Sequence, residues 1–133
     1  MSGERDLGRL LAGMRPERRP GEYVFAQAPE AAVAGLRIHA MVLEPEGPAF
    51  VLERADADAR GLRYDFVAAW LTLMVHSALD AVGLTAAVAT RLAAAGISCN
   101  VLAGALHDHL LVPVERADDA LAALRAAAEA ADG

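Results

Sequence analysis

The residues best suited to chemistry lie between Val75 and Thr85, where an apolar run gives way to a helical pattern. Gly83 permits a tight turn, and the helix after it offers unpaired N–H groups and a partial positive charge. A carboxylate is favoured there, Thr85 can cap the helix or touch a ligand, and Asp80 can face an ammonium group. The turn therefore carries both charges that a free amino acid requires. Ordinary capping and turn chemistry is the competing interpretation.

Other residues in and near this turn belong to the predicted ligand site. His76 and Ser77 precede the turn, and Leu84 opens the helix. Farther along, Ser98 and Asn100 fall on one face of a predicted strand, because successive side chains of a strand alternate. These two polar side chains are suited either to ligand binding or to pairing across a subunit interface.

The histidines suggest a different chemistry. His107 and His109 share a strand face and His76 ends the strand expected beside them, so three imidazoles can approach closely enough for zinc. Asp108 points the other way, and solvated or hydrogen-bonded histidines are the alternative. His76 and Ser77 project oppositely from a strand, and no glycine-x-serine-x-glycine elbow or phosphate-binding glycine pattern occurs. We therefore predict neither an enzyme nor a cofactor.

Residues 70–113 supply the elements that position these groups, in the order strand, helix, strand, strand. The helix is expected over 84–95, where Leu84, Val88 and Leu92 are spaced four apart and share one face. Small alanines surround them, so this face can pack closely on a sheet. An apolar strand over 64–75 precedes the helix, and strands over 97–103 and 109–114 follow it.

Four motifs in this order resemble the bacterial ACT-like proteins, which are related to amino-acid-sensing ACT modules. They are LLAGMRPERRPGEYVF, VHSALDAVGLTAAVA, LAAAGISCNV and HDHLLVP. Within the second motif, Asp80, Gly83 and Leu84 match the aspartate-x-x-glycine-aliphatic pattern of ACT turns. The resemblance implies a ferredoxin-like β-α-β-β-α-β arrangement, frequent dimerisation and effector amino acids near the first strand-to-helix loop. It implies no reaction and no particular ligand.

The N-terminal part is predicted to add a short amphipathic helix and three strands. The helix spans 6–14, and the strands span 22–27, 36–44 and 49–53, the last two forming a hairpin. Residues 15–21, with Arg15, Arg18 and Arg19, are predicted to be a solvated connector. Residues 55–63 are also predicted to be a solvated loop, because their spacing fails the calcium-loop pattern: no glutamate stands at its twelfth position.

One strand is missing from the ACT-like pattern. A helix is expected over 118–131, and a ferredoxin-like unit needs a fourth strand after its second helix. Only Asp132 and Gly133 follow. We therefore predict that a strand before Arg54 takes the fourth position, because natural sheets usually avoid open edges.

Composition narrows the function classes. With 133 residues the chain suits one domain, and its net charge of -6 argues against nucleic acid as a partner. The longest apolar run, residues 66–75, is too short for a membrane span. Cys99 is the only cysteine, which excludes an intramolecular disulfide and favours a cytoplasmic protein. No basic residue is adjacent to this cysteine in the sequence, so we interpret it as a small buried hydrophobe.

Together these observations predict one α+β, ferredoxin-like domain over 1–133, with the N-terminal helix and strands in 1–63 and the ACT-like core in 64–133. The predicted function is that of a homodimeric regulatory or sensing protein that binds a small molecule, a free amino acid by the resemblance. The alternatives are a structural oligomerisation module without ligand and a histidine-based metal-binding protein.

Overall fold

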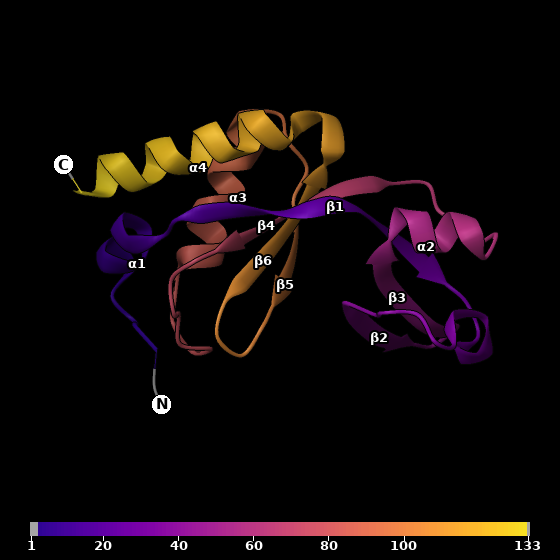
Figure 1. Cartoon of the computed structure of the whole chain (residues 1–133). Coiled ribbons are helices and arrows are strands. Elements are labelled where there is room, and N and C mark those ends of the chain that lie inside the picture. The colour runs from indigo at the N-terminus through magenta and orange to yellow at the C-terminus, as the bar shows by residue number, and fades with distance from the viewer. Residues whose placement is uncertain (1–2, 133) are drawn as a thin grey trace.

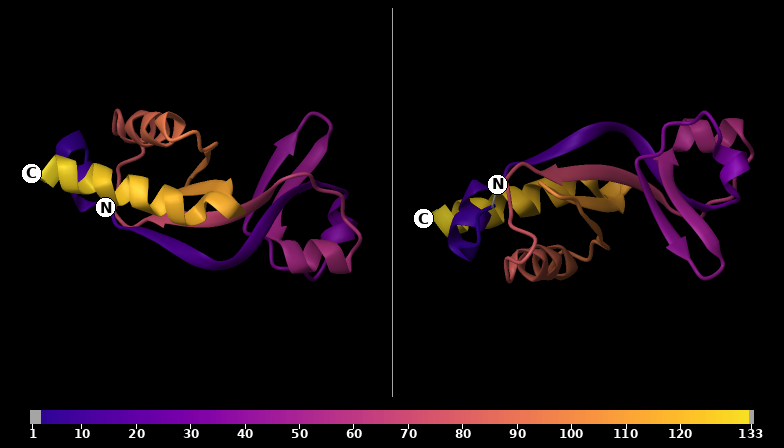
Figure 2. Two further views of the ribbon diagram at one scale, coloured as in Figure 1. Left: turned by 90° about the horizontal axis from the view of Figure 1, so that it is seen from above. Right: turned by 90° about the horizontal axis from the view of Figure 1, so that it is seen from below.

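A six-stranded antiparallel sheet organises the computed structural model, which describes residues 3–132. Its strands lie in the order β2-β3-β1-β4-β6-β5 (Figure 1). The sheet is strongly twisted, so the β2–β3 hairpin runs across the direction of the central strands (Figure 2). The strands are β1 (Pro16–Gln27), β2 (Ala40–Glu44), β3 (Gly47–Glu53), β4 (Val67–Leu73), β5 (Asn100–Ala103) and β6 (Asp108–Pro113).

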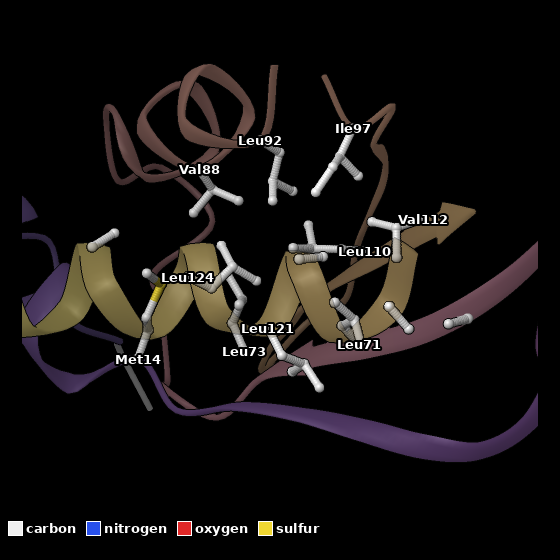
Figure 3. Packing of buried hydrophobic residues seen from close by; sticks show 14 of the residues in the cluster. Met14, Leu71, Leu73, Val88, Leu92, Ile97, Leu110, Val112, Leu121 and Leu124 are labelled. Atoms are coloured by element: carbon white, nitrogen blue, oxygen red, sulfur yellow. The ribbon is translucent and has the colours of Figure 1, made fainter. Parts of the chain in front are cut away.

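Three helices cover one face of the β1–β4–β6–β5 part of the sheet. They are α1 (Leu7–Gly13), α3 (Leu84–Ala94) and α4 (Ala117–Asp132). Val88 and Leu92 of α3 and Leu124 of α4 meet Leu71 and Leu110 of the sheet, all at most 1% exposed (Figure 3). The alternation of β4 explains this arrangement, because its odd-numbered residues face the helices. The predicted core face of α3 is confirmed.

The sheet consists of two interleaved ferredoxin-like units that share β1 and β4. In the first unit β1 is followed by a 3-10 turn, η1 (Glu30–Val33), then β2, β3 and the short helix α2 (Arg54–Ala59), and β4 is its fourth strand. In the second unit β4 is followed by α3, β5, β6 and α4. Its fourth position belongs to β1, which pairs antiparallel with β4. The prediction that a strand before Arg54 fills this position is confirmed.

Strand β1 begins at Pro16, so the predicted connector over 15–21 is wrong. The two prolines in this segment led us to predict a connector in place of a strand. Pro16 occupies the first position of the strand, and Pro20 lies in a register shift between Arg19 and Tyr23, where ladder pairing is interrupted. Proline is tolerated at these positions because a strand start or a bulge does not require its missing N–H.

Other boundaries also differ from the predictions: β5 begins at Asn100 and not at residue 97, and β4 is shorter than the predicted 64–75. The loop predicted over 55–63 contains α2, which buries only Ala57, and one buried position gives no helical period in the sequence. The strand predicted over 36–44 is ordered as a strand only from Ala40. Leu36 and Ile38 instead pack against the cluster beneath α2, so their apolar alternation reflects burial outside the sheet.

Candidate functional site

The connection between β4 and α3 is held in place by the N-terminal segment. The Glu4 amide donates a 2.8 Å hydrogen bond to the His76 carbonyl, and the Ala78 amide donates one of 3.0 Å to the Glu4 carbonyl. These bonds align Glu4 with Ser77 as an isolated parallel bridge. A side chain on Gly3 would lie only 2.5 Å from the Ala78 nitrogen, so the two segments approach very closely.

Gly83 forms the cap of α3 and has φ +104°, a left-handed conformation that favours glycine. A Cβ at this position would lie 3.1 Å from Cδ2 of Leu7 in α1. The next residue, Leu84, is 3% exposed and belongs to the core, whereas Thr85 is exposed. Glycine is therefore needed here for both its backbone conformation and the packing of α1. Its sequence-based role as a tight-turn residue is explained by this geometry.

A cavity of about 140 Å³ lies beside the start of α3. Its lining includes Ser77, Gly83 and Thr85, together with Gly104 of the β5–β6 connection and Asp108, the first residue of β6. The lining thus includes both the positive end of a helix and a carboxylate from the β5–β6 hairpin. Burial raises the pKa of the Asp108 carboxyl, against the opposing influence of His109 and His107.

Asp108, which the sequence interpretation turned away from the histidines and left unassigned, is the acidic group of this cavity. None of the ion pairs formed among residues 3–132 includes it. The sequence did not predict this role for Asp108, because the residue is far from the turn in the sequence and only the pairing of β6 with β4 brings the two segments together. Its position beside His107 was the one available signal.

Asp80, the residue predicted to face an ammonium group, lies outside this cavity. Its carboxylate is 2.9 Å from Nε of Arg5, and both side chains are more than half exposed. Asp80 and His76 instead line a separate hollow of about 280 Å³, which Ser77 shares with the cavity. The structure thus divides the predicted turn residues between two neighbouring concavities.

The predicted strand residues Ser98 and Asn100 are exposed and lie apart from the turn. Asn100 pairs with Leu111, whereas Ala103, which lines the cavity, pairs with Asp108. At about 3.4 Å of rise per residue, Asn100 is roughly 10 Å farther along β5. Asn100 therefore lies in the edge strand β5, whereas Ser98 precedes that strand, contrary to the prediction, and neither lines the cavity.

The histidines are not assembled as a metal site. Among the residues that the structure describes, no three His, Cys, Asp or Glu side chains converge. Nδ1 of His107 is 3.3 Å from the Val75 carbonyl, and Nδ1 of His109 is 3.0 Å from Oγ1 of Thr72. Both rings are thus hydrogen-bonded, as the alternative interpretation of the sequence described.

Cys99 packs at the edge of the helix-covered core. Burial raises the pKa of its thiol to about 11, which keeps it protonated at neutral pH. This agrees with its interpretation as a small hydrophobe.

Two family models cover almost the whole chain. An ACT domain model matches residues 2–69, and a second ACT domain model matches residues 66–126. This chain belongs to the ACT-domain family. The two matches meet at the start of β4, the strand that both ferredoxin-like units share.

Solved structures support the fold of this ACT-domain protein. A Vibrio cholerae protein of unknown function, described as a possible transport protein, is 45% identical with a TM-score of 0.83 and covers 92% of this chain and 95% of its own. An Agrobacterium tumefaciens protein is 20% identical, with a TM-score of 0.66 over 86% and 89% of the two chains. The ligand-free regulatory subunit of Thermus thermophilus aspartate kinase is 12% identical, with a TM-score of 0.67 over 84% and 95%.

The comparison with curated proteins gave no match. Over residues 3–132, no helix has the length and apolar character needed to cross a membrane.

Proposed function

We propose that this ACT-domain protein is a regulatory or sensing protein that binds a small free amino acid in the cavity between the start of α3 and Asp108. The observation that carries the proposal is the pair of opposite charges across one small concavity. The amino acid's carboxylate accepts hydrogen bonds from the first N–H groups of α3, and its ammonium group faces Asp108. Asp108 thereby replaces Asp80 as the acidic partner, because Asp80 is paired with Arg5.

The burial of Asp108 supports this assignment. A half-buried carboxylate without an ion-pair partner favours its neutral form, which is why its pKa is raised. A bound ammonium group would stabilise the charged form. Ligand binding would therefore lower the pKa of Asp108, and affinity for the zwitterion would fall as the pH approaches the pKa of the free carboxyl.

The cavity volume restricts the ligand. About 140 Å³ corresponds to the liquid volume of roughly five water molecules. This is below the roughly 300 Å³ of common small-molecule pockets. Glycine, alanine, serine and threonine are therefore the expected ligand class, and aromatic or long basic amino acids are expected to be excluded.

A second copy of the chain is expected to cover this site. Three large apolar side chains near the cavity are strongly exposed: Leu79 by 74%, Val82 by 83% and Leu106 by 55%. Because helix-terminal charge supplies only about 0.3 to 1 kcal/mol at an exposed surface, useful affinity requires burial of the ligand. We accordingly propose a homodimer, and a cytoplasmic location in keeping with the single cysteine.

Calorimetric titration with glycine, alanine, serine, threonine, phenylalanine and arginine tests the proposal. We expect saturable binding of one or more of the four small amino acids. Asp108→Asn should weaken this binding by about 10-fold or more, because the ammonium loses a charge-assisted hydrogen bond. The matched control is Asp65→Asn, at an exposed position in the loop before β4.

Absence of binding by every small amino acid at millimolar concentration would refute the ligand assignment and favour an oligomerisation module. Equal affinity of the wild type and Asp108→Asn would refute the placement of the ammonium group. Light scattering tests the assembly separately. A mass of only 13.9 kDa with ligand present would refute the homodimer.

A further inference from the structure

Residues 3–5 form a short segment, which we term the strap, that lies beside the connection between β4 and α3 (Figure 1). Glu4 makes both backbone hydrogen bonds of the strap to this connection: its amide donates to the His76 carbonyl, and its carbonyl accepts from the Ala78 amide. Gly3 lies so close to the connection that a larger residue would have to displace backbone atoms. The strap is therefore fitted to one conformation of the connection.

Helix α1, which follows the strap, is held in place without it. Oδ1 of Asp6 accepts a 2.9 Å hydrogen bond from the Arg9 amide and so caps the helix. Leu10 and Met14 are 0% and 2% exposed and lie in the helix-covered core. Because these anchors all come after the strap in the sequence, the strap is able to separate from the connection while α1 stays packed.

The strap supports a wall that two concavities share. Residues 77–79 line both the cavity of about 140 Å³ beside α3 and the hollow of about 280 Å³, whereas Gly3 and Arg5 line only the hollow. Among the described residues, every hydrogen bond and ion pair from residues 76–80 to another segment goes to Glu4 or Arg5. The wall of the cavity therefore depends on the strap for its position.

We propose that the strap controls the turn cavity. When fastened, it holds residues 77–79 in the conformation that forms the cavity, and its release lets this wall move. Release is a local opening, in which two backbone hydrogen bonds are exchanged for bonds to water while the core stays folded. Only the fastened fraction of molecules then binds ligand, so the apparent affinity falls in proportion to that fraction. The link to affinity rests on the proposed amino acid site, whereas the strap and its release do not.

The backbone contacts, and not the ion pair, hold the strap. Arg5 and Asp80 are joined by contacts of 2.9 and 3.3 Å, but their side chains are 57% and 73% exposed, and exposed ion pairs contribute little. A Cβ on Gly3, in contrast, would lie 2.5 Å from the Ala78 nitrogen and 2.6 Å from the Ser77 carbonyl carbon. These backbone atoms have no rotamer that moves them aside. Gly3→Ala is therefore incompatible with the fastened strap.

Amide hydrogen exchange of the full chain, followed by NMR, tests the strap without any ligand. In Gly3→Ala the Ala78 amide, which loses its Glu4 acceptor, should exchange at least about 10-fold faster than in the wild type. The Ala81 amide donates to the Ala78 carbonyl within the connection, so its faster exchange reports movement of the wall itself. The Leu10 amide should change by less than about 2-fold, because α1 stays packed.

Three further variants sharpen the comparison. Glu4→Pro removes an amide that bonds to the connection and should accelerate the same two amides, which keeps the test available if Gly3→Ala folds poorly. Arg5→Gln should accelerate them by less than about 5-fold, because it removes only an exposed ion pair. Gly8→Ala is the matched control and should exchange as the wild type, because its Cβ would make only an ordinary contact, 3.4 Å from Oδ1 of Asp6.

Unchanged exchange of Ala81 in folded Gly3→Ala and Glu4→Pro would overturn the proposal, because the wall would then keep its position without the strap. Equal acceleration of Leu10 would also overturn it, since the strap would then not be separate from α1.

Calorimetry with glycine, alanine, serine and threonine tests the link to the cavity. Gly3→Ala should bind at least about 5-fold more weakly than Gly8→Ala, and equal affinity would overturn that link. Failure of all four to bind the wild type would instead refute the proposed ligand class, and the exchange rates would still decide whether the strap positions the wall.

Discussion

The shared strands predict that the whole chain unfolds as one cooperative unit. Leu52 lies in the core of the first unit and Leu124 in that of the second, and both are 0% exposed. Leu→Ala at a fully buried position costs about 2 to 5 kcal/mol. For 133 residues the unfolding entropy is about 280 cal/mol/K, so this cost lowers the melting temperature by about 7 to 18 °C.

Either substitution, Leu52→Ala or Leu124→Ala, should shift one and the same transition. The reason is that β1 and β4 each belong to both units, so neither unit can unfold and leave the other with a complete sheet. Differential scanning calorimetry measures this as a single peak whose calorimetric and van't Hoff enthalpies agree. Leu43→Ala on β2, where the side chain is 73% exposed, is the control and should change stability by no more than about 0.5 kcal/mol.

Two resolved transitions, with Leu52→Ala shifting only one and Leu124→Ala only the other, would refute this reasoning. Such a result would mean that each unit unfolds independently of the other. A single peak that moves with either variant would instead support one domain over 1–133. The same melts give the stability of the protein on which the binding variants are compared.

Two further predictions concern the turn and the histidines. Gly83→Ala should lower the free energy of unfolding by more than the roughly 1 to 2 kcal/mol of a left-handed residue, because its Cβ also meets a leucine of α1 at 3.1 Å. Gly61→Ala is the control in urea unfolding, because Gly61 has a positive φ but open space around it. Equal losses of stability in the two variants would contradict the packing argument. Burial, and then Arg19, lower the pKa of both His39 and His109, so their contribution to stability is present above about pH 6.5 and is lost as the pH falls through the lowered values. Arg19→Met should raise both pKa values and flatten this acid-side loss, and an unchanged pH profile of unfolding would count against the assignment.

Local sequence patterns correctly predicted the elements in which buried residues recur at one regular spacing. The four-residue spacing of Leu84, Val88 and Leu92 located α3 because all three are buried on one face. The alternation along β4 was hidden by apolar residues on both of its faces, so its length, not its period, identified it as a strand. Strand β1 was partly missed because its pairing with β4 joins residues about fifty positions apart, a relation that no local window contains.

The candidate sites depend even more than the strands on contacts between residues that are far apart in the sequence. Gly83 was predictable because a glycine before a helical pattern has a local backbone reason. The pairing of Asp80 with Arg5, and the placement of Asp108 across the cavity from α3, arise only when separate segments meet. The same holds for Arg19, whose charge suggested a solvated loop until β1 brought it onto Trp70.

The two units differ at the position where an amino acid would bind. In the second unit the first strand is followed by α3, with 11 residues, whereas in the first unit it is followed by η1, with 4 residues. A single 3-10 turn has poorer hydrogen-bond geometry and too few aligned peptides to build a comparable positive end, and Glu30 in that turn repels an anion. The interleaved fold therefore repeats the scaffold but not the site. The proposed amino acid site should accordingly be filled once per chain, and a calorimetric stoichiometry of two per chain would require a second site of different construction.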